Sequence, residues 1–281
     1  MDPANLRAYD RPEVAQHYAG LDYLSACERL LFDRYLKRGM AILDLGVGGG
    51  RTTPYLAQIA THYVGVDYAA EMIRVCRSKF PDLEFIQRDA ADLSCFAASS
   101  FDAVVMAFNG LDYLSEEARE RCLRECYRIL RQQGVFVFSS HNPRAILGRP
   151  VWSKERVHEL AKKVAGGNRF VGGLLFAVLS GAAALKAFLL AGWGSLARVA
   201  RRIPTSAFWR GEGYFVDPSH GGLVTYCRIP ARTIVEVERV GFHFLQVQGD
   251  DYARTDCQYV TDWYYYVFSK SDSPAKGETC E

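Results

Sequence analysis

A glycine-rich turn between two acidic residues is the part of this sequence best suited to bind a ligand. Residues 41–51 read AILDLGVGGGR, and Asp67 ends the next apolar run. Glycine has no Cβ, so Gly46, Gly48 and Gly50 allow a tight turn and let a ligand approach the backbone. A carboxylate at the end of the second strand can accept hydrogen bonds from both hydroxyls of a ribose, at the edge where open α/β sheets bind ligands. The segment therefore predicts a nucleotide site.

Two kinds of nucleotide cofactor are compatible with such a turn. The dinucleotide fingerprint G-x-G-x-x-G requires a third glycine at position 51, where this chain has Arg51, and the third glycine here is Gly50. Asp44 stands two positions before the first glycine. This G-x-G-x-G pattern after an acidic residue resembles motif I of the class I S-adenosylmethionine (SAM) methyltransferases. SAM is therefore favoured over a nicotinamide cofactor.

The resemblance implies a fold and a set of cofactor contacts. The fold would be Rossmann-like α/β, with a seven-stranded sheet and helices on both faces, and the product of SAM would be S-adenosylhomocysteine (SAH). In this family the acidic residue and the glycine loop hold the methionine end of SAM. Carried onto this chain, the contacts are Tyr18 in an N-terminal cover segment, Asp44, Gly46, Gly48, Gly50, Asp67 on the ribose, Tyr68 and Met72 near the adenine, Asp89 and Ala90 at the adenine edge, and Phe108 and Asn109 facing the methyl group. For Tyr18 and Met72, plain packing is an equal alternative.

Apolar periodicity indicates the elements that would position these residues. Strands are expected at 42–45, 64–66, 83–87, 103–107, 135–139, 242–248 and 262–268, and helices at 22–37 and 230–240. The last helix and strand pair resemble the antiparallel end of the methyltransferase sheet. We therefore expect a SAM-binding core with its cover segment at 1–142, a lid or substrate-binding insertion at 143–229, a segment that completes the sheet at 230–270, and a flexible tail at 271–281.

Two histidines are the candidate general bases. Methyl transfer from SAM is an in-line displacement at an activated methyl group, so the protein mainly has to hold the reacting atoms in line. A hydroxyl acceptor usually needs a base, and histidine titrates near neutral pH. His141 ends the fifth strand and His220 follows in a polar loop, although His141 could equally orient the substrate or bond to the backbone. Candidate acceptor contacts are Tyr113, Asn142, Tyr214 and Tyr226. For Tyr214 and Tyr226, surface-loop or edge-strand positions are an equal alternative.

The insertion at 143–229 has an unusual composition. Residues 170–185 and 187–197 contain no charged residue, and Lys186 separates the two runs. Residues 151–204 hold nine Lys or Arg and two acidic residues, a local charge of +7. A membrane-spanning helix needs about 20 apolar residues and is disfavoured. A helical hairpin that lines a substrate pocket is favoured, and docking of residues 165–202 on an anionic membrane surface stays open.

Composition narrows the functional classes. The chain of 281 residues has a net charge of +2, which predicts no nucleic-acid partner, and Asn109 is not followed by the Pro-Pro-Tyr/Phe of nucleobase amino methyltransferases. Eight cysteines without a C-x-x-C pair, and an N-terminus without a signal peptide, predict a cytoplasmic protein that binds no metal. We expect a small-molecule methyltransferase with an apolar or amphipathic acceptor, oxygen methylation being favoured. The alternatives are a peripheral membrane enzyme acting on a lipid or quinone and a non-catalytic SAM-binding protein. The sequence does not indicate an oligomeric state.

Overall fold

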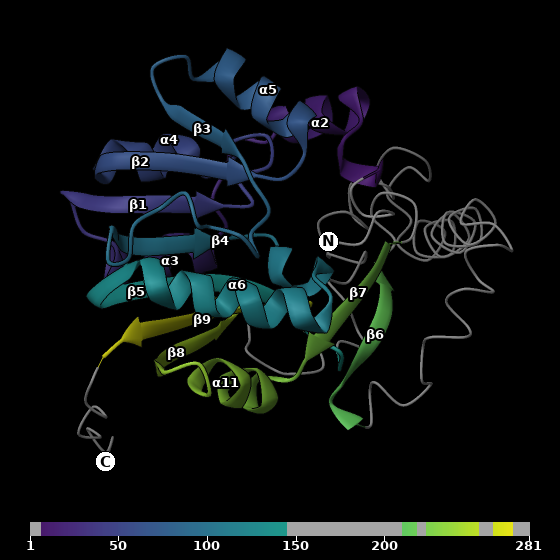
Figure 1. Cartoon of the computed structure of the whole chain (residues 1–281). Helices are drawn as coiled ribbons and strands as arrows, with labels where there is room; N and C mark the ends of the chain where they lie inside the picture. The colour runs from purple at the N-terminus through teal and green to yellow at the C-terminus, as the bar shows by residue number, and fades with distance from the viewer. Residues whose placement is uncertain (1–6, 145–209, 218–222, 253–260, 272–281) are drawn as a thin grey trace, which may run out of the picture.

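Short apolar runs form a seven-stranded sheet, and a separate pair of strands forms a second, small sheet (Figure 1). The computed structural model describes residues 7–144, 210–217, 223–252 and 261–271. The order of the large sheet is β3-β2-β1-β4-β5-β9-β8. Its strands are β1 (Met40–Leu45), β2 (Ala60–Asp67), β3 (Glu84–Gln87), β4 (Phe101–Met106), β5 (Leu130–His141), β8 (Phe242–Gly249) and β9 (Trp263–Lys270).

The order of the strands creates one position suited to a ligand. Strands β1 to β5 run parallel, and β9 lies antiparallel between β5 and β8. The chain leaves β1 towards β2 and β3 and then returns to β4 on the other side of β1. Ligands of open α/β sheets bind at the carboxyl ends of the strands at such a reversal. The expected seven-stranded Rossmann-like sheet is confirmed.

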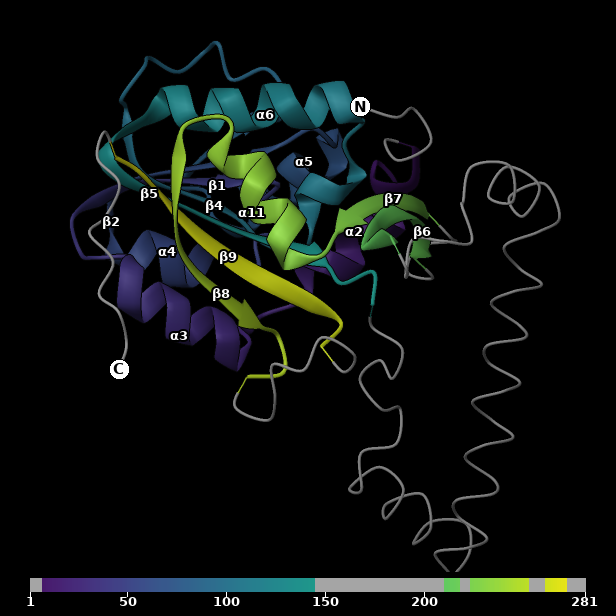
Figure 2. The ribbon, with the colours of Figure 1, turned by 90° about the horizontal axis from the view of Figure 1, so that it is seen from below.

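Helices cover both faces of the large sheet, because alternate residues of each strand point to opposite faces and both sets are apolar. Leu123 and Val237 pack in the core on one face, and Leu31, Leu56 and Ile73 pack in the core on the other. Figure 2 shows α6 on the opposite side of the sheet from α3 and α4. The helices are α3 (Ala26–Tyr35), α4 (Thr53–Ile59), α5 (Ala70–Lys79), α6 (Glu116–Ile129) and α11 (Pro230–Glu238).

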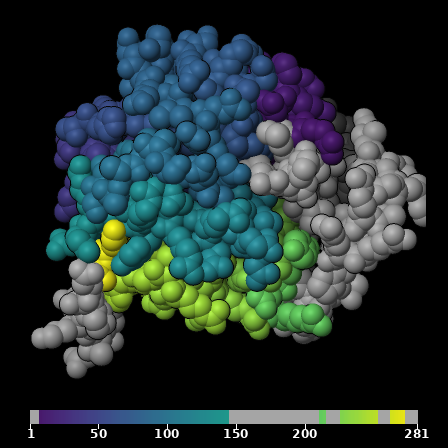
Figure 3. Space-filling model, viewed as in Figure 1, coloured from purple at the N-terminus to yellow at the C-terminus, as the bar shows by residue number. Residues whose placement is uncertain are grey.

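The N-terminal helix α2 (Pro12–Ala19) packs against α5 beside the glycine loop. Asp10 Oδ1 accepts a hydrogen bond from the backbone N–H of Glu71 (2.9 Å), and Lys79 Nζ donates to the carbonyl of Ala19 (2.9 Å). Figure 3 shows this N-terminal segment, in purple, lying against the blue surface of the core. A Cβ on Gly49 would come within 2.4 Å of the backbone of Tyr18 and Ala19. The backbones of the two segments therefore touch at Gly49.

We expect Gly49→Ala to loosen α2 from the core. The added methyl group would overlap backbone atoms, and overpacking of this kind costs about 1–3 kcal/mol. Urea unfolding should show that loss, and hydrogen exchange should rise in residues 12–19. Gly20→Ala is the matched control, because its Cβ would lie 3.4 Å from the nearest atom and Gly20 has a right-handed helical backbone. Equal stability of the two variants would contradict the close approach at Gly49.

Several element boundaries differ from those expected. Helix α3 begins at Ala26 rather than 22, because Ser25 and Glu28 form a capping box, and it ends at Tyr35. The end of the insertion expected at 143–229 holds the antiparallel strands β6 (Glu212–Asp217) and β7 (Leu223–Arg228), in which Tyr214 pairs with Tyr226. Aromatic cross-strand pairs stabilise such hairpins. His220, the span 165–202 and the tail at 272–281 lie outside the described residues. Within the described residues, no helix is long and apolar enough to cross a membrane.

Candidate active site

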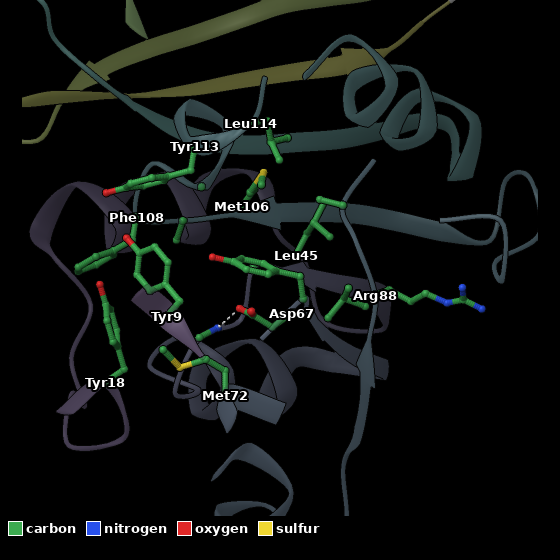
Figure 4. A pocket seen from close by; sticks show the side chains of 17 residues that line it. Tyr9, Tyr18, Leu45, Asp67, Met72, Arg88, Met106, Phe108, Tyr113 and Leu114 are labelled. Carbon is green, nitrogen blue, oxygen red and sulfur yellow. Dashed lines mark hydrogen bonds between the residues drawn. The ribbon is translucent and has the colours of Figure 1, made fainter. Parts of the chain in front are cut away.

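A pocket lies at the carboxyl ends of β1, β2 and β4 (Figure 4). Nine of the residues expected to contact cofactor or acceptor line it: Tyr18, Gly46, Gly48, Asp67, Tyr68, Met72, Ala90, Phe108 and Tyr113. The pocket also has lining residues that the motif left unassigned: Tyr9, Leu45, Val66, Arg88, Met106, Ala107, Gly110 and Leu114. Sequence periodicity marks most of these apolar residues as core and gives no signal that they face a ligand.

The glycine loop leaves open space on its pocket side. Gly46 and Gly48 have φ values of 71° and 55°, a left-handed backbone that favours glycine. A Cβ on Gly46 would meet no atom within 4 Å, and one on Gly48 would meet only the Tyr18 ring, at 3.9 Å. Any side chain there would fill the pocket, so the bare loop suits close contact with a ligand. Gly50 is absent from the lining of the pocket. The position that its Cβ would occupy faces the ring of Phe80, at 2.7 Å.

Asp67 presents a buried carboxylate to the same pocket. Its Oδ2 accepts a hydrogen bond from the N–H of Gly48 (2.9 Å), and its Oδ1 accepts one from the N–H of Ala69 (3.0 Å). Only 7% of the residue is exposed, and burial raises the pKa of the carboxyl group to about 6. The two backbone donors fix the carboxylate in place. Lone pairs of a fixed carboxylate are suited to the hydroxyls of a ribose.

Asp44 lies behind the glycine loop and is not part of the pocket wall. Its Oδ2 accepts hydrogen bonds from Thr52 Oγ1 (2.7 Å) and from the Tyr63 hydroxyl (2.9 Å). Burial raises the pKa of this carboxyl group to about 6. These hydrogen bonds hold the turn, and the expected cofactor contact of Asp44 stays a prediction. Asp89 is also absent from the lining, and its Oδ1 accepts from the N–H of Ala91 (2.9 Å).

The corner that follows β4 has a constrained backbone. Phe108 and Asn109 have consecutive positive φ values, 57° and 61°. The N–H of Asn109 donates to Ser139 Oγ (2.8 Å), which ties the corner to β5. Non-glycine residues in this conformation persist only where their surroundings hold them. The corner turns the Phe108 ring into the pocket and leaves Asn109 buried beside it.

A buried carboxylate that sequence inspection missed orients His141. Asp112 Oδ2 accepts hydrogen bonds from the backbone N–H (2.7 Å) and Nδ1 (2.9 Å) of His141. Because Nδ1 then carries the proton, the lone pair of neutral His141 is on Nε2, 3.2 Å from Asn109 Nδ2. Asp112 Oδ1 accepts from Ser140 Oγ (2.7 Å) and from Arg119 Nη1 (3.1 Å). The His141 ring lies 6.4 Å from the ring of Tyr113, which lines the pocket.

The other expected acceptor contacts are absent from the lining of this pocket. Asn142 Nδ2 donates to the carbonyl of Thr261 (2.9 Å) and its Oδ1 accepts from the N–H of Arg144 (3.0 Å), so its amide joins two loops. Tyr214 and Tyr226 contact each other on the β6–β7 hairpin, with ring centroids 4.8 Å apart. The assignment of these three residues to the acceptor stays a prediction. Within the described ranges, no three His, Cys, Asp or Glu residues gather as metal ligands would.

Comparison with known proteins identifies the family. A family model described as a methyltransferase domain matches residues 42–134. A probable S-adenosylmethionine-dependent methyltransferase of Mycobacterium tuberculosis is 33% identical over 101 residues, 36% of this chain and 35% of the relative. The matched segment, residues 42–134, is a methyltransferase domain of the class I SAM-dependent type. A demethylmenaquinone methyltransferase of Thermotoga maritima is 38% identical over 98 residues, 34% of this chain and 41% of the relative.

Solved methyltransferase structures share the fold over most of the chain. A SAM-dependent methyltransferase from Methanosarcina mazei has a TM-score of 0.53 at 17% identity, covering 89% of this chain and 99% of that one. The 1,6-didemethyltoxoflavin-N1-methyltransferase of Burkholderia thailandensis, solved with SAH, has a TM-score of 0.54 at 13% identity, covering 97% and 92%. The chain spans about two fifths of the length of the first curated relatives it matches.

Proposed function

We propose that this methyltransferase transfers the methyl group of SAM to the hydroxyl group of a small, apolar or amphipathic acceptor. The observation that carries the proposal is the fixed Asp67 carboxylate beside the open backbone of Gly46 and Gly48 in one pocket. In this proposal the glycine loop holds the methionine end of SAM, Asp67 holds the ribose, and Met72 and Ala90 contact the adenine. SAM supplies a methyl group on a sulfonium ion, from which sulfur leaves as a neutral thioether.

The acceptor end of the pocket is aromatic. Figure 4 places Tyr9, Tyr18, Phe108 and Tyr113 together at one end, away from Arg88. The rings of Tyr9 and Tyr113 are 5.6 Å apart, edge to face. Such a wall favours an apolar or aromatic acceptor and excludes water, and tyrosine hydroxyls can still orient a polar group. In the proposed reaction these residues position the acceptor oxygen in line with the methyl group.

We assign the base for a hydroxyl acceptor to His141. Its Nε2 would take the hydroxyl proton, and the Asp112 carboxylate at Nδ1 would stabilise the resulting imidazolium ion. The buried Oδ1 of Asn109 has no hydrogen-bond partner within the described part of the chain. Rotation of that amide would turn Oδ1 towards the new Nε2–H, so Asn109 can serve both charge states of His141. Asp112 and Asn109 act here as positioning residues.

A quinone-like acceptor is the second candidate. The observation that favours it is that several relatives, at 31–38% identity, are demethylmenaquinone methyltransferases. Such an acceptor would be bound at a membrane surface, and the basic, apolar span 165–202 would be the contact. A mass-shift screen that includes demethylated quinols together with simple phenols would distinguish the two candidates.

Calorimetry with the full chain tests the proposal. We expect SAM and SAH to bind the wild type, NADH not to bind, and Asp67→Asn to weaken both adenosyl ligands, because an amide loses the charge-assisted hydrogen bonds of the carboxylate. Turnover of any acceptor would exclude a purely binding function. If neither SAM nor SAH binds the folded wild type, the proposed function is wrong.

The pKa of Asp67 predicts how SAH affinity changes with pH. Burial raises this pKa to about 6, so the carboxylate is ionised at pH 7 and mostly protonated at pH 5. We expect the Kd for SAH to rise about tenfold between pH 7 and pH 5, since α-carboxyl and α-amino groups titrate outside this range. The raised pKa favours the folded state below about pH 4, and this contribution is lost as the pH rises through 6. Protonation of Asp67 therefore does not destabilise the fold at pH 5, so unfolding through Asp67 would not explain a higher Kd for SAH. In Asp67→Asn the Kd for SAH should be the same at pH 7 and pH 5.

A further inference from the structure

Arg51 replaces a glycine of the dinucleotide fingerprint, and the cofactor contacts proposed above give it no role. Its guanidinium group is buried, with 7% of the side chain exposed, and it forms a two-pronged ion pair with Glu28, which is fully buried. The carbonyl of Tyr23 also accepts a hydrogen bond from Arg51 Nη1 (2.7 Å). Glu28 further accepts from the Tyr265 hydroxyl (2.8 Å) and from the N–H of Ser25 (2.8 Å). The pair thus joins α3, the glycine loop and β9.

The Glu28–Arg51 pair lies directly behind the pocket wall. Arg51 Cζ is 4.0 Å from the centroid of the Phe108 ring, and Phe108 lines the pocket. A guanidinium group at this distance binds the face of an aromatic ring. Phe108 has a left-handed backbone, so this contact helps to hold a ring that its own backbone does not favour. Arg51 therefore supports Phe108 from behind.

The position of Arg51 raises an electrostatic problem for a cationic cofactor. SAM carries a positive sulfonium and SAH a neutral thioether, so a lone arginine behind the pocket wall would favour product over substrate. Glu28 cancels that charge within the same buried cluster. Asp44 is a further carboxylate close enough to interact with both members of the pair. In low-dielectric surroundings these charges would still interact with a sulfonium ion on the pocket side of the Phe108 ring.

We infer that the Glu28–Arg51 pair supports Phe108 without adding net charge of its own behind the wall, and that the charge balance of the pair thereby sets the preference of the pocket between SAM and SAH. This inference rests on the proposed function. It makes Arg51 a positioning residue and Glu28 the residue that balances its charge. The preference should then follow the net charge of the pair, and not the identity of either side chain.

A charge series measured by calorimetry tests the inference. Glu28→Gln leaves the pair positive, Arg51→Met leaves it negative, and the double variant restores neutrality. We expect the ratio of the Kd for SAM to the Kd for SAH to rise about tenfold in Glu28→Gln and to fall about tenfold in Arg51→Met. In the double variant the ratio should stay within about twofold of wild type. Arg51→Lys, which keeps the charge but loses the planar contact with Phe108, should weaken both ligands without changing their ratio.

The ratio separates charge from packing, because a general loosening of the pocket affects both ligands. Thermal unfolding of each variant identifies those that fold, and either folded single variant is sufficient, since each has its own predicted sign. The inference would be overturned if the ratio of the two Kd values were unchanged in a folded single variant, or if it changed as much in the double variant as in a single one. Either result would leave the proposed function intact. Failure of the wild type to bind either ligand would overturn both.

Discussion

Replacement of His141 by glutamine is expected to lower kcat for a hydroxyl acceptor by about 10²–10⁴-fold, the usual contribution of a general base. The affinity for SAH should stay within about twofold of wild type, because the proposed SAH contacts, Asp67 and the glycine loop, do not include His141. Glutamine has a similar length and can occupy the hydrogen-bonded position, but it cannot take a proton. A lower kcat with unchanged SAH affinity would therefore report the loss of proton transfer and not a change in the shape of the site.

The same reasoning extends to Asp112. Asp112 accepts from Nδ1 of His141 and so fixes the lone pair on Nε2. In Asp112→Asn the amide can orient its N–H₂ towards Nδ1, which favours the other tautomer and leaves Nε2 protonated. We expect a loss in kcat close to that of His141→Gln, and little further loss in the double variant, because the two residues act as one unit.

Initial rates of SAH formation, with an acceptor found by mass-shift screening, measure these effects. His62→Gln is the matched control, since His62 is exposed near the start of β2 and far along the strand from the pocket edge. An amine acceptor offers a second control, because a neutral amine can attack without a base. Unchanged kcat with a hydroxyl acceptor in His141→Gln would remove His141 from the mechanism.

Arg119→Met is expected to lower the free energy of unfolding by about 3–5 kcal/mol, the range for an ion pair broken in a protein interior. The Arg119 side chain is 2% exposed and contacts Asp112 (3.1 Å) and Glu236 (2.8 Å). Methionine matches much of its volume but carries no charge. Glu236 would keep its contact with Arg228 (2.6 Å), so the uncompensated charge would fall mainly on Asp112. Loss of Arg119 should therefore also disturb His141.

Urea unfolding, followed by circular dichroism in the absence of ligand, measures this loss. Arg124→Met is the control on the same helix, because its pair with Glu120 is solvent-exposed on both sides. Exposed pairs of this spacing contribute about 0.3–0.5 kcal/mol. A loss below about 1 kcal/mol in Arg119→Met would mean that water reaches Asp112 and that its charge is not confined as the structure indicates.

Local sequence patterns determined the core sheet and two parts of the candidate site, the glycine loop and Asp67. Apolar runs of strand length indicated the strands, and the resemblance to the methyltransferases implied the seven-stranded sheet that they form. The sheet brings the carboxyl ends of its parallel strands to one edge. The glycine spacing and Asp67 needed no partner elsewhere in the chain to be recognised. The start of α3 was also readable, since Ser25 and Glu28 have the spacing of a capping box, a signal that the apolar pattern obscured.

Tertiary structure alone decided which polar side chains face the pocket and which turn inwards. Asp44 faces Thr52 and Tyr63, and nothing in the spacing of motif I indicates either partner. Asp112 and His141 meet across 29 positions, and Arg51 and Glu28 across 23. Side-chain type and local period determine which elements form, because these depend on neighbours along the chain. The partner of a buried charge depends instead on which elements the fold packs together. The sequence by itself therefore determined the sheet, the glycine loop and Asp67. The pairing of the charged groups behind them was decided by packing.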